Sequence, residues 1–139
     1  MAKEKKHNNS KRRVSPGFKL RKKFHNAFKG LVVALREEST LIYYAIITIL
    51  VIGIGIWVEL DSIEWAILLL TIGVLFGIEF LNTAIENFVD LLSFEYNVHA
   101  KKIKDICAAA SVLNSIMSIA IGAFIFYNPF VARIEDFLK

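Results

Sequence analysis

The sequence has very little of what builds a disulfide-bonded or loop-rich protein. It contains one cysteine, Cys107, two prolines and seven glycines in 139 residues. A single cysteine excludes an internal disulfide, and so little proline and glycine argues against long irregular loops. The three histidines, His7, His25 and His99, are scattered without the spacing of metal ligands. Nothing in this composition indicates a zinc site.

The motifs of soluble nucleotide-binding folds are also absent. The chain has neither a GxxxxGK[ST] loop nor a GxGxxG loop, and its one short Gly-Ile-Gly sequence, at 53–55, lies inside an apolar run. A P-loop or Rossmann enzyme is therefore excluded. Phosphoryl transfer as such is not excluded, because it needs metal, positive charge and a well-placed acceptor rather than one particular loop.

Charge is missing from long stretches of the sequence. Hydrophobic residues make up 55% of the chain, and residues 41–58 contain no charged side chain. Apolar runs at about 41–58, 65–92 and 106–127 are each long enough to cross a bilayer. We predict an all-α integral membrane protein with three transmembrane helices.

An amphipathic helix is predicted before the first span, at residues 17–38. Leu20, Phe24, Phe28, Leu31 and Leu35 recur at helical spacing, and lysines lie mostly on the other side. Such a helix is typical of the headgroup region of a membrane. We expect residues 1–15 to be a disordered basic tail and residues 16–139 to form a single membrane domain.

Positive charge is concentrated at the amino terminus. Residues 1–40 hold 12 of the 17 Lys and Arg residues but three of the 13 acids. Because this basic segment lies next to membrane spans, we expect it to contact anionic lipid headgroups and to stay in the cytoplasm, rather than to bind nucleic acid. The loop at 59–64 is acidic, and Lys101, Lys102 and Lys104 precede the third span. We therefore expect a multi-pass protein of the cytoplasmic membrane, with the amino terminus and the second loop in the cytoplasm.

The second span carries polar residues on one face. With about 100° per residue, Glu79, Asn82, Glu86 and Asp90 fall within an arc of about 80° on the helix. Acids inside a span are costly, and they usually mark a functional site. Clustered carboxylates next to a membrane surface suggest metal binding, general base catalysis, or proton and cation transport.

We assign roles from depth and helical position. Glu79 is the deepest acid and could meet a lipid hydroxyl, so it is the candidate base. Glu86 is a candidate Mg²⁺ ligand. Glu38 shares the apolar stripe of the preceding helix, whereas Glu37 is rotated away, so we favour Glu38 as the second ligand. Asn82 could orient a phosphate or the base, and Lys104 could offset phosphate charge. The alternatives are a small ion translocator and a structural subunit.

One motif resembles a known family. The string Glu79-Phe-Leu-Asn82-Thr-Ala-Ile-Glu86-Asn-Phe-Val-Asp90, followed by Lys104-Asp105-Ile-Cys-Ala-Ala-Ala, is similar to the signature of the bacterial integral-membrane diacylglycerol kinase/undecaprenol kinase family. The resemblance covers nearly everything from residue 18 onward. It implies a homotrimer of three-span protomers, each with an amino-terminal surface helix. It also implies transfer of the γ-phosphate of ATP, with Mg²⁺, to a membrane lipid hydroxyl, either undecaprenol or diacylglycerol.

The resemblance implies a role for individual residues. Glu79 would be the catalytic base that contacts the lipid, Glu38 and Glu86 would bind the metal with its nucleotide, and Asn82 and Asp90 would support the site. Further nucleotide contacts would come from Glu95, Tyr96, Asn97, Lys104 and Asp105. Lys19 and Asn26 stand where the family tends to have an arginine and a tyrosine that touch ATP. The lysine keeps the positive charge, and the asparagine lacks the ring.

Overall fold

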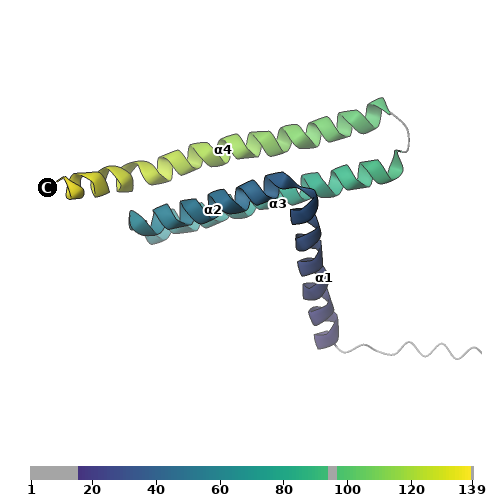
Figure 1. The fold of residues 1–139 in the computed structure, drawn as a ribbon, viewed down its shortest axis with the longest axis horizontal. Coiled ribbons are helices and arrows are strands. Elements are labelled where there is room, and N and C mark those ends of the chain that lie inside the picture. Colours follow the sequence, from purple (N-terminus) through teal and green to yellow (C-terminus); the bar gives the residue numbers. More distant parts are fainter. Residues whose placement is uncertain (1–15, 94–96, 139) are drawn as a thin grey trace, which may run out of the picture. The chain divides into compact units, whose positions relative to one another are not determined.

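The chain forms four α-helices over the residues that the structure, a computed structural model, describes: 16–93 and 97–138. They are α1 (Pro16–Glu37), α2 (Ser39–Trp57), α3 (Ser62–Leu92) and α4 (Val98–Phe137) (Figure 1). By its contacts the chain divides into two units, Met1–Val33 and Ala34–Lys139. The prediction of one amphipathic helix followed by three long apolar helices is confirmed.

The helix α1 keeps its apolar stripe uncovered within its own unit. Leu20, Phe24 and Phe28 are all more than half exposed. The lysines at 19, 22, 23 and 29 are exposed as well. A helix with uncovered aromatic residues on one side and lysines on the other has the composition expected of a helix in a headgroup layer.

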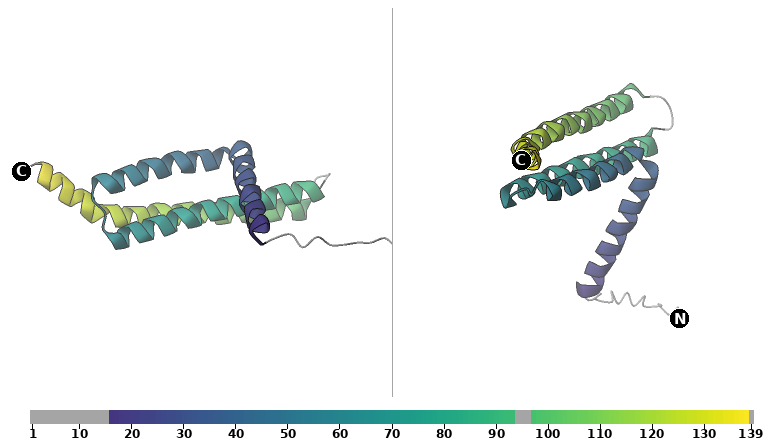
Figure 2. Two further views of the ribbon diagram at one scale, coloured as in Figure 1. Left: turned by 90° about the horizontal axis from the view of Figure 1, so that it is seen from below. Right: turned by 60° about the vertical axis from the view of Figure 1, so that its left-hand side comes forward.

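The other three helices are long and apolar enough to cross a membrane. At 1.5 Å per residue, α2 with 19 residues spans about 28 Å, close to the thickness of the hydrocarbon core. The 40 residues of α4 span about 60 Å, so this helix extends well beyond that thickness. It contains Pro129, which cannot donate a helical hydrogen bond. Near its yellow C-terminal end α4 changes direction (Figure 2).

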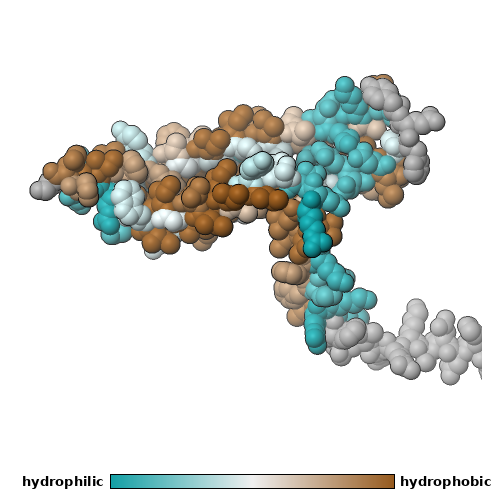
Figure 3. Space-filling view, viewed as in Figure 1, coloured by the Kyte–Doolittle hydropathy of each residue, from teal (hydrophilic) through white to brown (hydrophobic). Residues whose placement is uncertain are grey.

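The three long helices run alongside one another, and α3 makes most of the contacts. It packs along α4 and touches α2 over a shorter stretch (Figures 1 and 2). The apolar core is small and lies near the turn between α2 and α3, where Val58, Leu60, Leu68 and Ile125 are buried together. Figure 3 shows hydrophobic side chains over the middle of these helices and hydrophilic ones near the α3–α4 connection. This pattern suits surfaces that face lipid tails.

The turn between α2 and α3 is built by backbone hydrogen bonds. Glu59 has a positive φ of 60°, its N–H donates to the Ile56 carbonyl, and the Leu60 N–H donates to the Gly55 carbonyl. This pair of bonds is the Schellman motif that ends many helices. Asp61 then caps α3 in a capping box with Glu64. The turn sets α3 antiparallel to α2.

Candidate active site

Glu79 lies on the inner side of α3, against α4. Its side chain is 5% exposed, and one carboxylate oxygen accepts a hydrogen bond from the hydroxyl of Ser111, itself 8% exposed. Thr83 is buried one turn further and donates to the Glu79 carbonyl oxygen at 3.0 Å. A buried carboxylate needs such partners, because an unpaired one is costly. The contact fixes the position of the predicted base.

Glu38 is the residue between α1 and α2 in the sequence. Its backbone is extended, with φ −115° and ψ 108°, and it is the N-cap residue of α2. Partial burial raises the pKa of the Glu38 carboxyl, and the charges of Glu86 and Glu79 raise it further. Glu37 adds to this effect, whereas Lys104 lowers the pKa. The carboxylates of Glu86 and Glu79 on α3 and of the adjacent Glu37 therefore all act on Glu38.

Glu37 occupies a different position from its neighbour. It is exposed, and its carboxylate accepts a hydrogen bond from Asn87 on α3 at 3.1 Å. Glu38 is half-buried. The helical periodicity of the sequence likewise predicts Glu37 on the solvent side and Glu38 on the apolar side. The assignment of Glu38 as a metal ligand stays a prediction.

Asn82 and Glu86 lie one turn apart on α3 and contact each other. The amide nitrogen of Asn82 donates to Glu86 Oε1 at 3.2 Å. The amide oxygen Oδ1 of Asn82 is buried, and it is the only such side-chain atom without a partner in the part of the chain that the structure describes. Leaving a buried acceptor unpaired costs about 1–3 kcal/mol. This oxygen is therefore available to a ligand at the acidic end of α3.

Lys104 and Asp90 join the start of α4 to the end of α3. The Lys104 ammonium contacts both carboxylate oxygens of Asp90 at 3.0 Å. The Asp90 side chain is 63% exposed, and that of Lys104 is partly buried, at 35%. The pair places a cation beside the acids, where a phosphate would need one.

The remaining predicted residues are less closely assembled. The Asn97 side-chain oxygen caps α4 by accepting from His99 N at 2.8 Å, which leaves its amide N–H groups for other contacts. Asp105 is exposed. Lys19 and Asn26 are exposed on α1 in the first unit. Glu95 and Tyr96 lie outside the described residues.

The sequence did not predict two partners of these acids, Ser111 and Asn87, or the contact between Tyr44 and Ser115. Ser111 belongs to a stripe of small residues on α4, a pattern that indicates helix packing rather than a contact with Glu79. Asn87 follows Glu86 directly but has no motif of its own. Tyr44 bonds Ser115 from α2, with 2.6 Å between their hydroxyl oxygens. The one signal in the sequence for the contact between Ser111 and Glu79 was that this serine lies on a neighbouring span at a similar depth.

The acids do not form a complete metal cage. Over residues 16–93 and 97–138, no three His, Cys, Asp or Glu side chains gather closely enough to hold a metal ion. Mg²⁺ does not require such a cage, because it usually takes one or two carboxylates plus water and substrate phosphates. Glu38, Glu86 and the free Asn82 oxygen offer that type of donor set.

The family model described as prokaryotic diacylglycerol kinase matches residues 25–126. An undecaprenol kinase of Bacillus subtilis is 39% identical over 105 residues, which are 76% of this chain and 85% of that protein. A diacylglycerol kinase of Escherichia coli K12 is 26% identical over 75% of this chain and 85% of its own. One from Helicobacter pylori is 33% identical over 63% and 68%. The chain belongs to the prokaryotic diacylglycerol kinase family.

Membership of this family defines the class of protein. The chain is an enzyme, a lipid kinase with membrane-spanning helices. The interpretation as a kinase is thereby confirmed over those of an ion translocator and of a structural subunit.

Proposed function

We propose that this enzyme transfers the γ-phosphate of Mg-ATP to the hydroxyl of a membrane lipid, with Glu79 as general base. The observation that carries the proposal is the buried Glu79 carboxylate, held by Ser111 on one side of a cluster that contains Glu38, Glu86 and Lys104. The names of the relatives support undecaprenol or diacylglycerol as the acceptor.

The reaction is a single displacement at phosphorus. The lipid O–H bond breaks as its proton moves to Glu79, and the lipid oxygen forms a bond to the γ-phosphorus. The bond from that phosphorus to the β-γ bridging oxygen breaks, and ADP leaves with the electron pair. Ser111 keeps the carboxylate in one orientation during the proton transfer.

Mg²⁺ would be held by Glu38 and Glu86, with the Asn82 oxygen as a further donor. The unpartnered Asn82 Oδ1 supports this fit, since a cation would satisfy it. Bound there, the metal would neutralise phosphate charge. Lys104 at the start of α4 is paired with the exposed Asp90 of α3. Its ammonium group would contact the nucleotide phosphates. Lys19, Asn26, Glu95, Tyr96, Asn97 and Asp105 are proposed as further nucleotide contacts.

The cytoplasmic membrane is the proposed location, with the amino terminus and the acidic end of α3 on the cytoplasmic side, where ATP is found. The positive charge of residues 1–40 supports this orientation. Residues 16–139 would form one membrane kinase domain preceded by a basic tail.

A homotrimer is the proposed assembly. Gly73 and Gly77 on α3 have open space where a side chain would lie, so a second copy could approach closely at this face. Crosslinking that gave monomers at every protein concentration would contradict this part of the proposal.

The direct test is phosphorylation of lipid by the purified protein with labelled ATP. We expect labelled lipid with Mg²⁺ and none after chelation. The Glu86→Gln variant should raise the KM for Mg-ATP, with a smaller effect on the KM for lipid. Asn87→Ala, which removes the neighbouring amide from Glu37 instead, is the matched control. Labelled lipid at normal rates in chelator would refute the metal assignment, and no labelled lipid under any condition would refute the function.

A further inference from the structure

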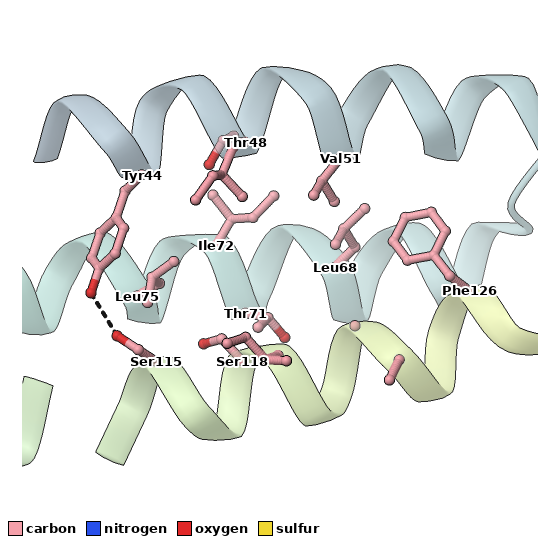
Figure 4. A pocket seen from close by; sticks show the side chains of 14 residues that line it. Tyr44, Thr48, Val51, Leu68, Thr71, Ile72, Leu75, Ser115, Ser118 and Phe126 are labelled. Carbon is pink, nitrogen blue, oxygen red and sulfur yellow. Dashed lines mark hydrogen bonds between the residues drawn. The ribbon is translucent and has the colours of Figure 1, made fainter. Parts of the chain in front are cut away.

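A groove of about 480 Å³ runs along α3 between α2 and α4. Its walls are mainly apolar, with Val51 from α2, Leu68 and Ile72 from α3, and Phe126 from α4 (Figure 4). It exists because α3 packs along α4 whereas α2 makes few contacts with either helix. Cavities of roughly 300–1,000 Å³ commonly hold small organic ligands.

One end of the groove carries a hydrogen-bonded pair of hydroxyls. Tyr44 and Ser115 join their hydroxyls there (Figure 4). Ser115 donates its proton to the Ser111 carbonyl oxygen at 3.0 Å, so the proton between Tyr44 and Ser115 must come from Tyr44. The Tyr44 oxygen then retains acceptor capacity. Ser111, one helical turn away, contacts Glu79, so this end of the groove leads to the carboxylate.

The other hydroxyls in the groove are mostly occupied. Ser118 donates to the Asn114 carbonyl at 2.9 Å and Thr71 to the Ile67 carbonyl at 2.8 Å. Of the five hydroxyl groups that line the groove, four therefore already donate within the protein, and Thr48 is the exception with no bond of its own here. The groove can accept a hydrogen bond at Tyr44 but offers at most one donor.

The shortage of donors discriminates between acceptor lipids. A diglyceride carries two ester carbonyls beside its free hydroxyl, and each needs a donor when it is buried. A long-chain alcohol with only hydrocarbon next to its hydroxyl needs none. It needs one acceptor for its hydroxyl proton. The Tyr44 oxygen can accept from this hydroxyl as the alcohol enters, before Glu79 takes the proton in the reaction. The groove thus matches an ester-free alcohol in shape and in polarity.

We propose, resting on the kinase function above, that this groove holds the hydrocarbon chain of an ester-free polyprenol-type alcohol and that Tyr44 receives its hydroxyl on entry, at the groove end that Ser115 and Ser111 connect to Glu79. Tyr44 is then a positioning residue for the acceptor, and Ser115 fixes its orientation. The ring of Tyr44 is held edge-on to Phe76, with 6.2 Å between ring centroids. The Tyr44 hydroxyl therefore has a defined position at the polar end of the groove.

The first test removes the Tyr44 hydroxyl alone. Tyr44→Phe keeps the ring, and we expect its KM for a polyprenol to rise about five- to tenfold, the effect of one lost hydrogen bond. The KM for Mg-ATP should stay within about twofold. Tyr43→Phe is the matched control, because Tyr43 is the neighbouring tyrosine, is 63% exposed and does not line the groove. If Tyr44 had only a structural role, Tyr44→Phe would change the KM for polyprenol and the KM for Mg-ATP together, or change neither.

The second test fills the groove. A side chain at Gly122 would enter open space, so Gly122→Leu should fold and obstruct the chain. We expect about a tenfold or larger rise in KM for a long polyprenol and a clearly smaller rise for a short alcohol such as geraniol. Gly53→Leu is the control, since Gly53 also has open space but lies outside the groove.

The outcomes separate this proposal from the kinase function. If the wild type phosphorylates lipid but Gly122→Leu and Tyr44→Phe leave the polyprenol KM unchanged, the groove assignment is wrong and the kinase stands. If Gly122→Leu instead breaks the oligomer in crosslinking, the groove holds a helix of a second copy, which also overturns it. A preference for diacylglycerol over polyprenol in the wild type overturns the ester-free acceptor. No lipid phosphorylation at all overturns both.

Discussion

The two ends of the helical unit formed by residues 34–139 are held together in different ways. At the end with the α2–α3 turn, apolar side chains such as Val58, Leu68 and Ile125 are buried together. Toward the opposite end, the buried polar groups Glu79, Thr83 and Ser111 are joined by hydrogen bonds, and the apolar residues Ala34, Leu41 and Val89 are buried as well. One end is therefore a packed anchor and the other a polar site. In a bilayer this division is reasonable, because buried polar groups must find partners inside the protein.

The comparison indicates where each kind of substitution should act. Changes at the polar end should lower the rate of phosphoryl transfer more than the stability, and changes at the packed end should do the reverse. Polar active sites are commonly less stable than they could be, because their groups are arranged for substrate.

The largest effect is expected from Glu79→Gln. Glutamine can still accept the hydrogen bond from Ser111 but cannot take a proton from the lipid, so kcat should fall about 10²- to 10⁴-fold. The melting temperature in detergent should change little. Steady-state kinetics with labelled ATP and a circular dichroism melt provide the two readings. A kcat within a few fold of the wild type would remove Glu79 as the base.

Gly55→Leu should give the opposite result at the packed end. A side chain there would begin 3.0 Å from Leu60 Cδ1 and 3.1 Å from the Trp65 ring. Such overpacking typically costs about 1–3 kcal/mol. The melting temperature should fall while the folded fraction keeps its kcat. Gly53→Leu, with open space around it, should melt like the wild type. Equal losses of melting temperature in Gly55→Leu and Gly53→Leu would show that packing around Gly55 is not especially tight.

A smaller loss of stability is expected from Asp61→Ala. The Asp61 carboxylate accepts from the N–H groups of Ile63 at 2.7 Å and Glu64 at 2.8 Å, and the loss of an N-cap costs about 1 kcal/mol. Glu64→Gln can keep the reciprocal bond to the Asp61 N–H and should cost less. Thermal melts of both variants measure the difference. Identical melting temperatures for Asp61→Ala and the wild type would show that the cap contributes nothing.

The smallest effect concerns pH at the polar end. Burial and neighbouring acids raise the pKa of Glu38 above its ordinary value of 4.5, so the folded state binds more protons than the unfolded state between that value and the raised one. The contribution of Glu38 to stability is therefore fully favourable below pH 4.5 and is lost as the pH rises through this window. Glu38→Gln should flatten the decline in metal-free melts. Glu135→Gln, an exposed acid near the C-terminus of α4, should not. A steeper decline in Glu38→Gln would contradict the sign.

Much of the fold was predictable because its signals are local. Apolar runs predict the three long helices, since in a bilayer each must satisfy its own backbone hydrogen bonds. The boundaries were less predictable: α4 begins at Val98 and continues past Pro129 to Phe137, beyond the predicted span 106–127. Helix ends that lie outside the hydrocarbon core need not be apolar, so hydropathy does not mark them.

The site was predictable where its residues share one helix. The spacing of Glu79, Asn82 and Glu86 places them on one face of α3 whatever surrounds it, because helical geometry alone sets that face. Partners on other helices carry no such signal. Nothing local links Glu79 to Ser111, or Asn87 to Glu37, 50 positions away.

By itself, the sequence determined the membrane-spanning helices, the polar face of α3 and the family, because hydropathy and spacing act within one segment. Only the tertiary structure decided that Ser111 contacts Glu79, that the Asn82 oxygen lacks a partner, and that a groove with Tyr44 at its end lies between α2 and α4. These features depend on how closely separate helices approach. That distance follows from side-chain packing across the whole bundle, which no single segment contains.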